Sequence, residues 1–394
     1  MTANLYALFR SRFPRDAEKP ALIPRQGSAV SYGELDALSA QIAAVLLSDG
    51  AAPGDRVAVQ VEKSPMAVAL YLACVRAGLV YLPMNTAYRD DELDYFIGDA
   101  EPSVIVGDPA SKILPQIGEK YGAKAYLTLD ARGQGSLEQA ARAAAPRTAI
   151  HRNDAGDLAA ILYSSGTTGK PKGVMLSHGN LASNALTLHR LWQFGPDDVL
   201  LHALPIYHVH GLFVAMNTTF LNGTPMLFHD KFVAEDVISD LPRARVFMGV
   251  PTYYVRLLAS PAFTRDVCAN MRLFISGSAP LLGETFDSFT ERTGMQILER
   301  YGMTEAGMIT SSLPDKPRRA GIVGWPLPDV TLRLGSESGE IEIKGPNVFG
   351  GYWRKPDKTA ADFTADGFFK TGDIGQIGDD GAVAIVGRAK DMII

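Results

Sequence analysis

The sequence predicts an α/β fold with two α/β subdomains and a small β-rich subdomain. Segments of helical and strand periodicity alternate through the first third of the chain, which is typical of a largely parallel sheet with helical crossovers. After about residue 321 the pattern changes to short alternating strands. The length of 394 residues also exceeds the roughly 250 to 300 residues at which a single hydrophobic core stops growing.

The first subdomain is predicted over residues 1–156. Ser31 and Glu34 have the spacing of a capping box, and apolar residues then share one helical face until Gly50. An alanine-rich and then polar stretch indicates a surface connection at the end of this subdomain. Between these points strands are predicted at 56–61, 79–82 and 102–106, and a second helix at 65–77.

The later boundaries follow from the same patterns. A strand, a glycine-rich loop and a helix with one apolar face begin the second subdomain, and an antiparallel hairpin is predicted in the β-rich part. The predicted ranges are 157–320 for the second α/β subdomain, 321–387 for the β-rich subdomain with hairpin strands at 331–334 and 340–344, and 388–394 for a hinge.

The composition excludes several classes of protein. Hydrophobic residues make up 46% and charged residues 21%, as in soluble globular proteins. The 38 basic residues form no run that could follow a phosphate backbone, so no nucleic-acid partner is expected. The longest apolar stretch, 66–75, is shorter than the roughly 20 residues that span a bilayer, and residues 1–20 lack the apolar core of a signal peptide. Cys74 and Cys268 lie among apolar neighbours without metal-site spacing. A cytoplasmic protein is therefore expected.

The strongest local signal is the segment YSSGTTGKPKG at 163–173, which follows a predicted strand and precedes a predicted helix. It contains three glycines, four serine or threonine hydroxyls and two lysines. Backbone N–H groups, hydroxyls and positive charge in one short loop suit a polyphosphate ligand. The P-loop pattern GxxxxGK[ST] does not fit this segment. A polar surface turn is the alternative interpretation.

The segment resembles the phosphate loop of the acyl-adenylate-forming superfamily. Further motifs similar to those of that family follow in its order: LPIYHVHG at 204–211, SGSAP at 276–280, YGMTE at 301–305, GEIEIKG at 339–345, KTGD at 370–373 and GRAK at 387–390. The resemblance covers nearly the whole chain. It implies the large amino-terminal domain of the adenylate-forming fold and the activity of an ATP-dependent acyl-CoA synthetase.

In that chemistry a carboxylate attacks the α-phosphorus of ATP, pyrophosphate leaves, and coenzyme A then accepts the acyl group. Fixed donors and a metal ion stabilise the charge on the phosphoryl oxygens. The resemblance implies that Thr304 contacts the α-phosphate, that Glu305 ligates Mg²⁺ and that Lys172 adds positive charge. The loop residues implied to hold the phosphates are Ser164, Ser165, Gly166, Thr167, Thr168 and Gly169.

The resemblance also implies residues around the nucleoside. Asp373 and Arg388 would bind the ribose, and Tyr301 would offer its ring to adenine. Glu299 occupies the position that contacts the adenine amino group. The remaining implied residues are Gly277, Ser278 and Ala279 as the opposite wall of the adenine site, Arg300 and Gly302 beside Tyr301, and Lys390 at the hinge.

His208 and His210 have the spacing of a metal pair, but no third ligand lies near them in sequence. Zinc ligation and a structural histidine therefore remain alternatives at this stage. By resemblance, His208 matches the gate beside the reacting carboxylate.

Arg256 is the residue on which the substrate prediction rests. It is predicted at the start of an apolar helical segment, where an inward arginine would require an anionic partner such as the second carboxylate of a dicarboxylate. The motif set is similar to that of malonyl-CoA synthetases, which implies malonate as substrate. Gly277, Ser278 and His208 would then line the acid site and Met308 would limit its size. The alternative for Arg256 is a side chain that reaches solvent.

Other functions stay open from the sequence: a ligase for methylmalonate or a monocarboxylate, or a nucleotide-binding domain without turnover. In the family a small carboxy-terminal domain supplies a catalytic lysine, and this sequence ends at Ile394, where that domain would begin. The sequence as given is therefore expected to bind ATP or AMP but to form acyl-CoA poorly.

Overall fold

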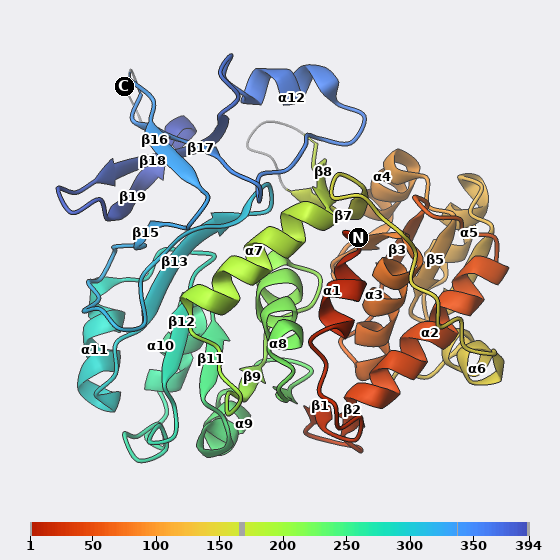
Figure 1. The fold of residues 1–394 in the computed structure, drawn as a ribbon, viewed down its shortest axis with the longest axis horizontal. Coiled ribbons are helices and arrows are strands. Elements are labelled where there is room, and N and C mark those ends of the chain that lie inside the picture. The colour runs from red at the N-terminus through yellow and green to blue at the C-terminus, as the bar shows by residue number, and fades with distance from the viewer. Residues whose placement is uncertain (1, 165–169, 337, 392–394) are drawn as a thin grey trace. The chain divides into compact units, whose positions relative to one another are not determined.

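The fold is described from a computed structural model over residues 2–164, 170–336 and 338–391 (Figure 1). The chain forms two compact units. Unit 1 contains residues 1–182, 205–208 and 349–353, and unit 2 contains residues 183–204, 209–348 and 354–394. The subdomain boundaries drawn from the sequence stay predictions.

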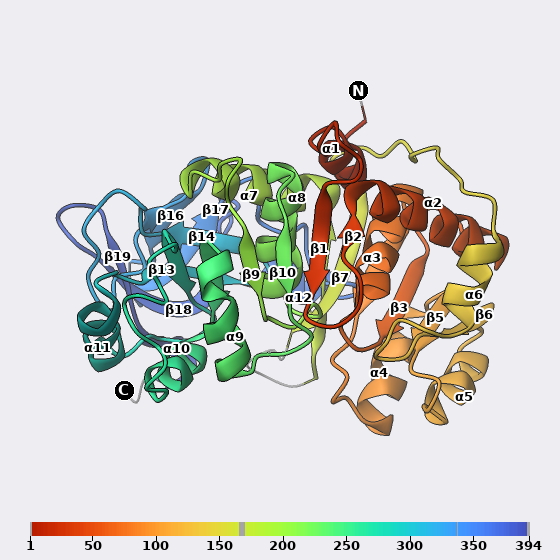
Figure 2. The same ribbon diagram turned by 90° about the horizontal axis from the view of Figure 1, so that it is seen from below.

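Unit 1 is built on a sheet with the strand order β6-β5-β3-β4-β7-β8, in which every neighbouring pair except β7–β8 is parallel. A hairpin of β1 and β2 also belongs to this unit (Figure 2). Its helices are α1 (Leu5–Arg10), α2 (Tyr32–Ser48), α3 (Pro65–Ala77), α4 (Asp90–Ala100), α5 (Ile113–Lys120) and α6 (Ser136–Ala143). Its strands are β1 (Pro20–Pro24), β2 (Val30–Ser31), β3 (Arg56–Gln60), β4 (Val80–Pro83), β5 (Val104–Gly107), β6 (Ala125–Thr128), β7 (Leu158–Ser164) and β8 (Lys172–Ser177).

The position of the phosphate-loop motif corrects one expectation. The motif does not connect a strand to a helix, because the antiparallel strand β8 lies between the loop and the next helix. Tyr163 pairs with Gly173, and Ser164 pairs with Lys172. The motif therefore contains the connection of a β-hairpin. The strands β7 and β8 stay paired up to Ser164 and Lys172.

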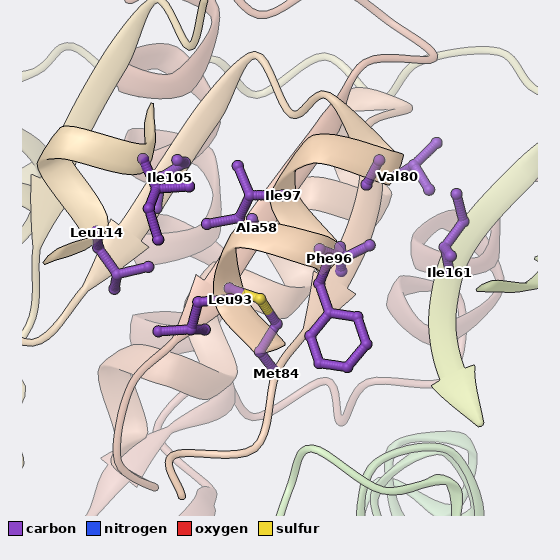
Figure 3. Packing of buried hydrophobic residues seen from close by; sticks show 12 residues of the cluster. Ala58, Val80, Met84, Leu93, Phe96, Ile97, Ile105, Leu114 and Ile161 are labelled. Carbon is purple, nitrogen blue, oxygen red and sulfur yellow. The ribbon is translucent and has the colours of Figure 1, made fainter. Parts of the chain in front are cut away.

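Hydrophobic side chains from the sheet and from α4 and α5 form a core in unit 1 (Figure 3). Phe96 and Ile97 on α4 pack with Val80 on β4, Ile105 on β5 and Ile161 on β7, and all five are at most 1% exposed. Apolar residues on parallel strands are buried in this way because helices cover the faces of such a sheet. This core fixes α4 to the strand that leads into the phosphate-loop motif.

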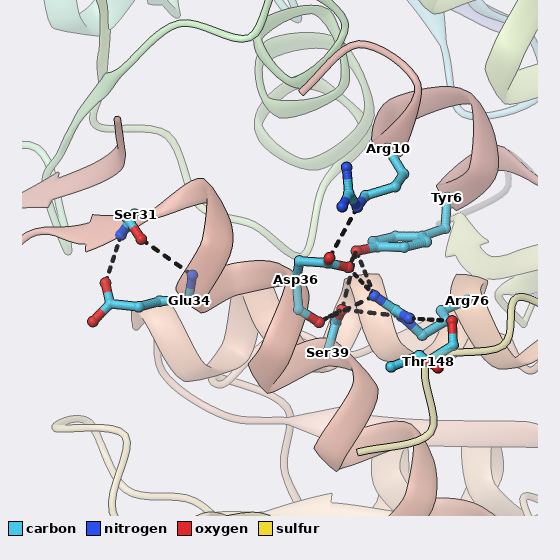
Figure 4. A network of polar contacts seen from close by, with 8 residues as sticks. All are labelled: Tyr6, Arg10, Ser31, Glu34, Asp36, Ser39, Arg76 and Thr148. Carbon is cyan, nitrogen blue, oxygen red and sulfur yellow. Dashed lines mark hydrogen bonds and ion pairs between the residues drawn. The ribbon is translucent and has the colours of Figure 1, made fainter. Parts of the chain in front are cut away.

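The predicted start of α2 is confirmed, since Ser31 Oγ accepts a hydrogen bond from the Glu34 amide and Glu34 accepts one from the Ser31 amide. A buried polar network lies near this helix (Figure 4). The Arg76 guanidinium is 2% exposed and contacts both Asp36 and the Tyr6 hydroxyl. Tyr6 donates to Asp36 at 2.6 Å, and burial raises the pKa of Tyr6 to about 12. The network neutralises a buried arginine where α1, α2 and α3 meet.

Unit 2 contains strands in the order β15-β14-β13-β12-β11-β9-β10, parallel from β13 to β10 and antiparallel at β14 and β15. These strands are β9 (Leu200–His202), β10 (Met226–Phe228), β11 (Val246–Gly249), β12 (Leu273–Ser276), β13 (Leu298–Met303), β14 (Gly307–Ser311) and β15 (Trp325–Pro326). The helices outside unit 1 are α7 (His178–Leu191, which begins in unit 1), the π-helix η1 (His210–Met216), α8 (Asn217–Asn222), α9 (Ala234–Asp240), η2 (Leu241–Arg243), α10 (Pro251–Leu258), α11 (Gly283–Thr293), α12 (Pro356–Asp362) and η3 (Ala389–Asp391).

A small antiparallel sheet completes unit 2, with the order β16-β17-β18-β19. Its strands are β16 (Thr331–Leu334), β17 (Glu340–Lys344), β18 (Phe369–Ile377) and β19 (Val383–Arg388). The predicted hairpin is β16–β17, and its pairing confirms the predicted β-rich subdomain. Within the described ranges no helix is long and apolar enough to cross a membrane.

Candidate active site

The described ends of the phosphate-loop motif hold Ser164 and Lys172 opposite each other on β7 and β8. The Lys172 side chain is 8% exposed, and its ammonium lies 4.7 Å from the centroid of the Tyr352 ring. The remaining predicted loop residues lie outside the described part of the chain: Ser165, Gly166, Thr167, Thr168 and Gly169.

His208 also belongs to unit 1, and its ring packs edge-on against Tyr207 with 4.6 Å between the centroids. The side chain is exposed to solvent, although neighbouring protein atoms desolvate the ring and lower its pKa below the usual histidine value. A neutral imidazole open to solvent can accept or donate a hydrogen bond at pH 7.

In unit 2, Thr304 and Glu305 occupy the tight turn between β13 and β14. Two glycines make this turn possible. A Cβ atom on Gly302 would lie 2.2 Å from the Gly307 carbonyl oxygen, and Gly307 has a left-handed φ of +60°. The Glu305 side chain is only 7% exposed although it lies in a turn. A buried carboxylate in a tight turn is suited to ligate a hard cation such as Mg²⁺.

Two buried asparagines hold this turn, and sequence reasoning missed both. The Asn184 amide on α7 donates to the Met308 carbonyl at 2.9 Å and accepts from the Met308 amide at 3.1 Å. Asn347 donates to the carbonyls of Ala306 and Met308 at 2.8 and 3.1 Å. The only sequence signal was Asn184 beside the apolar face of its helix, where an uncompensated amide would be costly.

Tyr301, Asp373 and Arg388 come together, as the resemblance implied for residues around the nucleoside. The Tyr301 hydroxyl donates to Asp373 Oδ2 at 2.6 Å, and Arg388 Nε lies 2.8 Å from Asp373 Oδ1. Asp373 and Arg388 are paired neighbours on β18 and β19. Burial and the Asp373 charge raise the pKa of Tyr301, so the phenol stays protonated and remains a donor.

Glu299 has a partner that the sequence did not predict. Its carboxylate accepts a hydrogen bond from the Gly321 amide at 2.9 Å, and the side chain is 5% exposed. Burial raises the pKa of Glu299 to about 7, against the opposing effect of the Gly321 bond. A contact of Glu299 with the adenine amino group stays a prediction.

Arg300 points to the opposite face of β13 from Glu299 and Tyr301, because side chains alternate along a strand. Its guanidinium is buried against Gly277, where a Cβ atom would lie 2.5 Å from the arginine Cζ. The small residue at 277 therefore makes room for Arg300. Arg300 Nη2 donates weakly to Ser278 Oγ at 3.4 Å, and Ser278 itself has an unusual left-handed φ of +72°.

The surroundings of Arg300 leave a buried positive charge without a counterion. Within the described residues it has no carboxylate partner, and its Nε has no acceptor. Burial lowers the pKa of Arg300 to about 9, which still leaves the group charged at pH 7. The fully buried His210 lies 3.3 Å from Ser278 Oγ, and burial together with the Arg300 charge keeps its pKa well below the usual histidine value. The cluster of Arg300, His210 and Ser278 has unused hydrogen-bond donors suited to an anion.

Arg256 differs from its prediction in position. It lies in the last turn of α10, not at the start of the helix, and it is exposed. Its guanidinium lies 4.9 Å from the centroid of Phe232, which itself stacks on Tyr253. Met308 is 2% exposed and pairs with Gly302 across the hairpin.

Among the described residues no three His, Cys, Asp or Glu side chains form a cluster that could hold a metal ion by themselves. His208 and His210 therefore form no such site there. Glu305 alone is compatible with Mg²⁺, since this ion usually keeps several waters and takes one or two carboxylates together with substrate phosphates. The Lys390 side chain lies outside the described residues.

A family model for AMP-binding enzymes matches residues 9–353. The chain belongs to the AMP-binding enzyme family. Among solved structures it is similar to ATP-bound MatB from Rhodopseudomonas palustris, with 51% identity, a TM-score of 0.97 and coverage of 100% of this chain and 80% of that one. Among curated relatives it is 32% identical to the mitochondrial malonate–CoA ligase of Bos taurus, over 97% of this chain and 73% of that protein. It is also 32% identical to a feruloyl-CoA synthase of Amycolatopsis, over 93% of this chain and 75% of that protein.

Proposed function

We propose that this AMP-binding enzyme is an acid:CoA ligase of the AMP-forming type, and that its acid is malonate. ATP and malonate would give malonyl-AMP and pyrophosphate, and coenzyme A would then displace AMP to give malonyl-CoA. The family match supports the nucleotide chemistry. The similarity to a malonate–CoA ligase and to MatB supports the choice of acid.

One observation of the site carries the choice of a dicarboxylate: the buried charge of Arg300. Removing an arginine from water without a counterion costs several kcal/mol, and a bound carboxylate would offset that cost. Malonate keeps one carboxylate for the reaction and has a second one to neutralise Arg300. The Ser278 hydroxyl and a neutral His210 would supply hydrogen bonds to the same group. The resemblance assigned Arg300 to the nucleotide site, whereas this proposal assigns it to the binding of the acid substrate.

The other site residues take roles on the nucleotide side of the reaction. Lys172 would place positive charge at the phosphates, and Thr304 would donate to the α-phosphate. Asp373 would accept hydrogen bonds from the ribose hydroxyls, with Arg388 beside it and the Tyr301 ring against adenine. Glu305 would supply one ligand to Mg²⁺, which neutralises charge on the leaving pyrophosphate when it is bound. We place the reaction in the cytoplasm.

Arg256 remains a candidate for the same acid. Its guanidinium is fixed by stacking on Phe232, and an exposed arginine can steer an anion to the site without a desolvation cost. Arg300 and Arg256 can therefore be separated by experiment, since a buried charge affects the bound state and an exposed one mainly affects association.

The test is the rate of acid-dependent pyrophosphate exchange with malonate, methylmalonate, propionate and ferulate. Wild-type protein should prefer malonate over propionate. Arg300→Met, which keeps the volume and removes the charge, should lower kcat/KM for malonate by roughly a hundredfold or more and leave propionate nearly unchanged. Arg190→Met on the exposed face of α7 is the matched control.

Three outcomes would contradict the proposal. Preference of the wild type for propionate or ferulate would exclude the dicarboxylate. Equal loss with malonate and propionate in Arg300→Met would make Arg300 structural. Loss of AMP binding by the same variant, measured by calorimetry, would return Arg300 to the nucleotide site.

A further inference from the structure

Helix α4 in unit 1 presents two side chains, Tyr95 and Asp99, to the two ends of the phosphate-loop motif. The two residues are four positions apart, so they lie on one face of the helix, one turn from each other. The face is held against the sheet because Phe96, between them in sequence, is buried in the core of Figure 3. Neither residue belongs to a motif that the sequence analysis identified.

The first end of the motif is bound by Asp99. The Tyr163 hydroxyl donates to Asp99 Oδ2 at 2.6 Å, and the Tyr163 ring packs on Phe96 with 4.5 Å between the centroids. The Asp99 carbonyl also accepts a hydrogen bond from the Trp353 indole at 3.0 Å. The end of β7 is thus tied to α4 through the Tyr163 side chain.

The second end is bound by Tyr95. Its hydroxyl donates to the Pro171 carbonyl at 2.8 Å, and the Lys170 ammonium lies 5.2 Å from the centroid of its ring. Pro171 has no N–H group, so its carbonyl is the only backbone group through which this residue can be hydrogen-bonded. Lys172, the cation proposed for the phosphates, follows directly in sequence. Tyr95 therefore fixes the backbone next to that cation.

We propose that Tyr95 and Asp99 are positioning residues for the triphosphate, acting through the ends of the motif and through Lys172. This inference rests on the proposed role of the motif in binding ATP. Fixing the backbone at Tyr163 and Pro171 in advance reduces the conformational entropy that Lys172 and its described neighbours lose when they hold a ligand. The effect should concern the β- and γ-phosphates, because the motif is assigned to the phosphates and the nucleoside to residues of unit 2.

The test compares Tyr95→Phe with a matched control, Tyr121→Phe, in which the tyrosine follows α5 and bonds to α4. The Tyr121 hydroxyl donates to Asp94 of α4 at 3.1 Å but has no contact with the motif among the described residues. Each variant keeps the aromatic ring and removes one hydroxyl. Tyr95→Phe loses the hydrogen bond from α4 to Pro171, and Tyr121→Phe loses the hydrogen bond to Asp94 on α4. Calorimetry gives the affinities for ATP and for AMP, and urea unfolding gives the stability.

Tyr95→Phe should weaken ATP binding roughly five- to tenfold, the effect of one lost hydrogen bond, and change AMP binding less than about twofold. Tyr121→Phe should change neither affinity and should lower stability about as much as Tyr95→Phe. Asp99→Asn, which keeps the shape and weakens the bond to Tyr163, should repeat the selective loss of ATP affinity to a smaller extent.

Unchanged ATP affinity in Tyr95→Phe would overturn the inference, and so would equal losses for ATP and AMP, which a general structural role would produce. These results can be separated from a failure of the proposed function. Wild-type protein that binds no adenine nucleotide would overturn the proposed function itself. Wild-type protein that binds ATP but does not use malonate would overturn only the choice of acid, and the Tyr95 comparison would still decide this inference.

Discussion

Two β-hairpin connections carry most of the residues assigned to the phosphates, and they are held in different ways. At the connection between β7 and β8 in unit 1, the flanking residues Tyr163 and Pro171 are fixed by hydrogen bonds from the phenol hydroxyls of two half-buried tyrosines, Tyr163 itself and Tyr95. The turn between β13 and β14 in unit 2 is fixed from inside by the amides of Asn184 and Asn347, both buried.

The difference predicts how each region responds to mutation. A half-buried hydroxyl that is removed can be replaced by water, so its loss affects the position of the loop more than the stability of the fold. A buried amide that is removed leaves backbone groups without partners, and the whole desolvation cost then appears as lost stability. Mutations beside the β7–β8 connection, and at Glu305 at the tip of the β13–β14 turn, should therefore change activity more than stability. Mutation of Asn184, which holds the base of that turn, should lower stability.

The largest effect is expected at the tip of the second connection. Glu305→Ala should lower the pyrophosphate exchange rate roughly a hundred- to a thousandfold, because the carboxylate is proposed to hold the ion that stabilises the leaving group. Its melting temperature should be no lower than that of wild type, since a functional buried charge does not stabilise the fold. A near-normal exchange rate would remove Glu305 from the metal site.

At the base of the same turn, Asn184→Ala should lower the free energy of unfolding by about 1 to 3 kcal/mol, because it leaves the Met308 N–H without its side-chain acceptor and removes one of the two side-chain donors to the Met308 carbonyl. Urea denaturation measures this change. Asn180→Ala tests a half-buried asparagine near the start of the same helix, whose oxygen accepts from the Ser177 amide, and it should cost less. Equal costs would mean that burial of the amide is not the decisive difference.

The pH dependence of stability should report Glu299 on β13. Its folded pKa of about 7 lies above the ordinary glutamate value of 4.5, so the folded state retains a proton that the unfolded state releases. Its contribution is complete below the unfolded pKa and is lost as pH rises to about 7, by up to about 3 kcal/mol. Urea unfolding should therefore show that the free energy of unfolding of the wild type falls between pH 5 and 8. In Glu299→Gln this fall should be smaller. Parallel curves for both proteins would show that Glu299 is already ionised in the fold at pH 5.

The smallest effect is expected at Tyr352, whose ring lies against the Lys172 ammonium. Tyr352→Leu should weaken ATP binding about three- to fivefold, as expected for one cation–π contact, and Tyr352→Phe should not. Calorimetry with ATP distinguishes the two variants. If both bind ATP as the wild type does, the ring does not position Lys172.

Local patterns predicted the elements that local physics determines. The capping box at Ser31 and the left-handed Gly50 bounded α2 correctly, and alternation predicted the β16–β17 hairpin. Strand β8 was missed because it begins inside the glycine-rich motif, where composition suggested a loop. The π-helix η1 was also missed, since its apolar run has no period that distinguishes it from a buried helix.

The sequence predicted those site residues that belong to the recognised motifs. Tyr301, Asp373 and Arg388 were named together and lie together. The partners that hold the motifs come from distant positions: Asn184 lies 124 residues from Met308, and Tyr95 lies 76 residues from Pro171. Nothing in the local sequence around these residues records such pairings. The exposure of Arg256 and the burial of Arg300 likewise depend on tertiary packing, which local sequence does not encode.

The segment 349–353 has a consequence for how the protein is made. Tyr352 pairs with Val174 on the outer strand β8, and the Trp353 indole bonds to the Asp99 carbonyl, 254 residues earlier in the chain. At about 5–20 residues per second, a ribosome completes this segment roughly ten seconds or more after it has completed β8. Until then the nascent sheet presents an unpaired edge of the kind that joins with other chains. Slowing translation between β8 and Trp353 should therefore increase aggregation of the nascent protein.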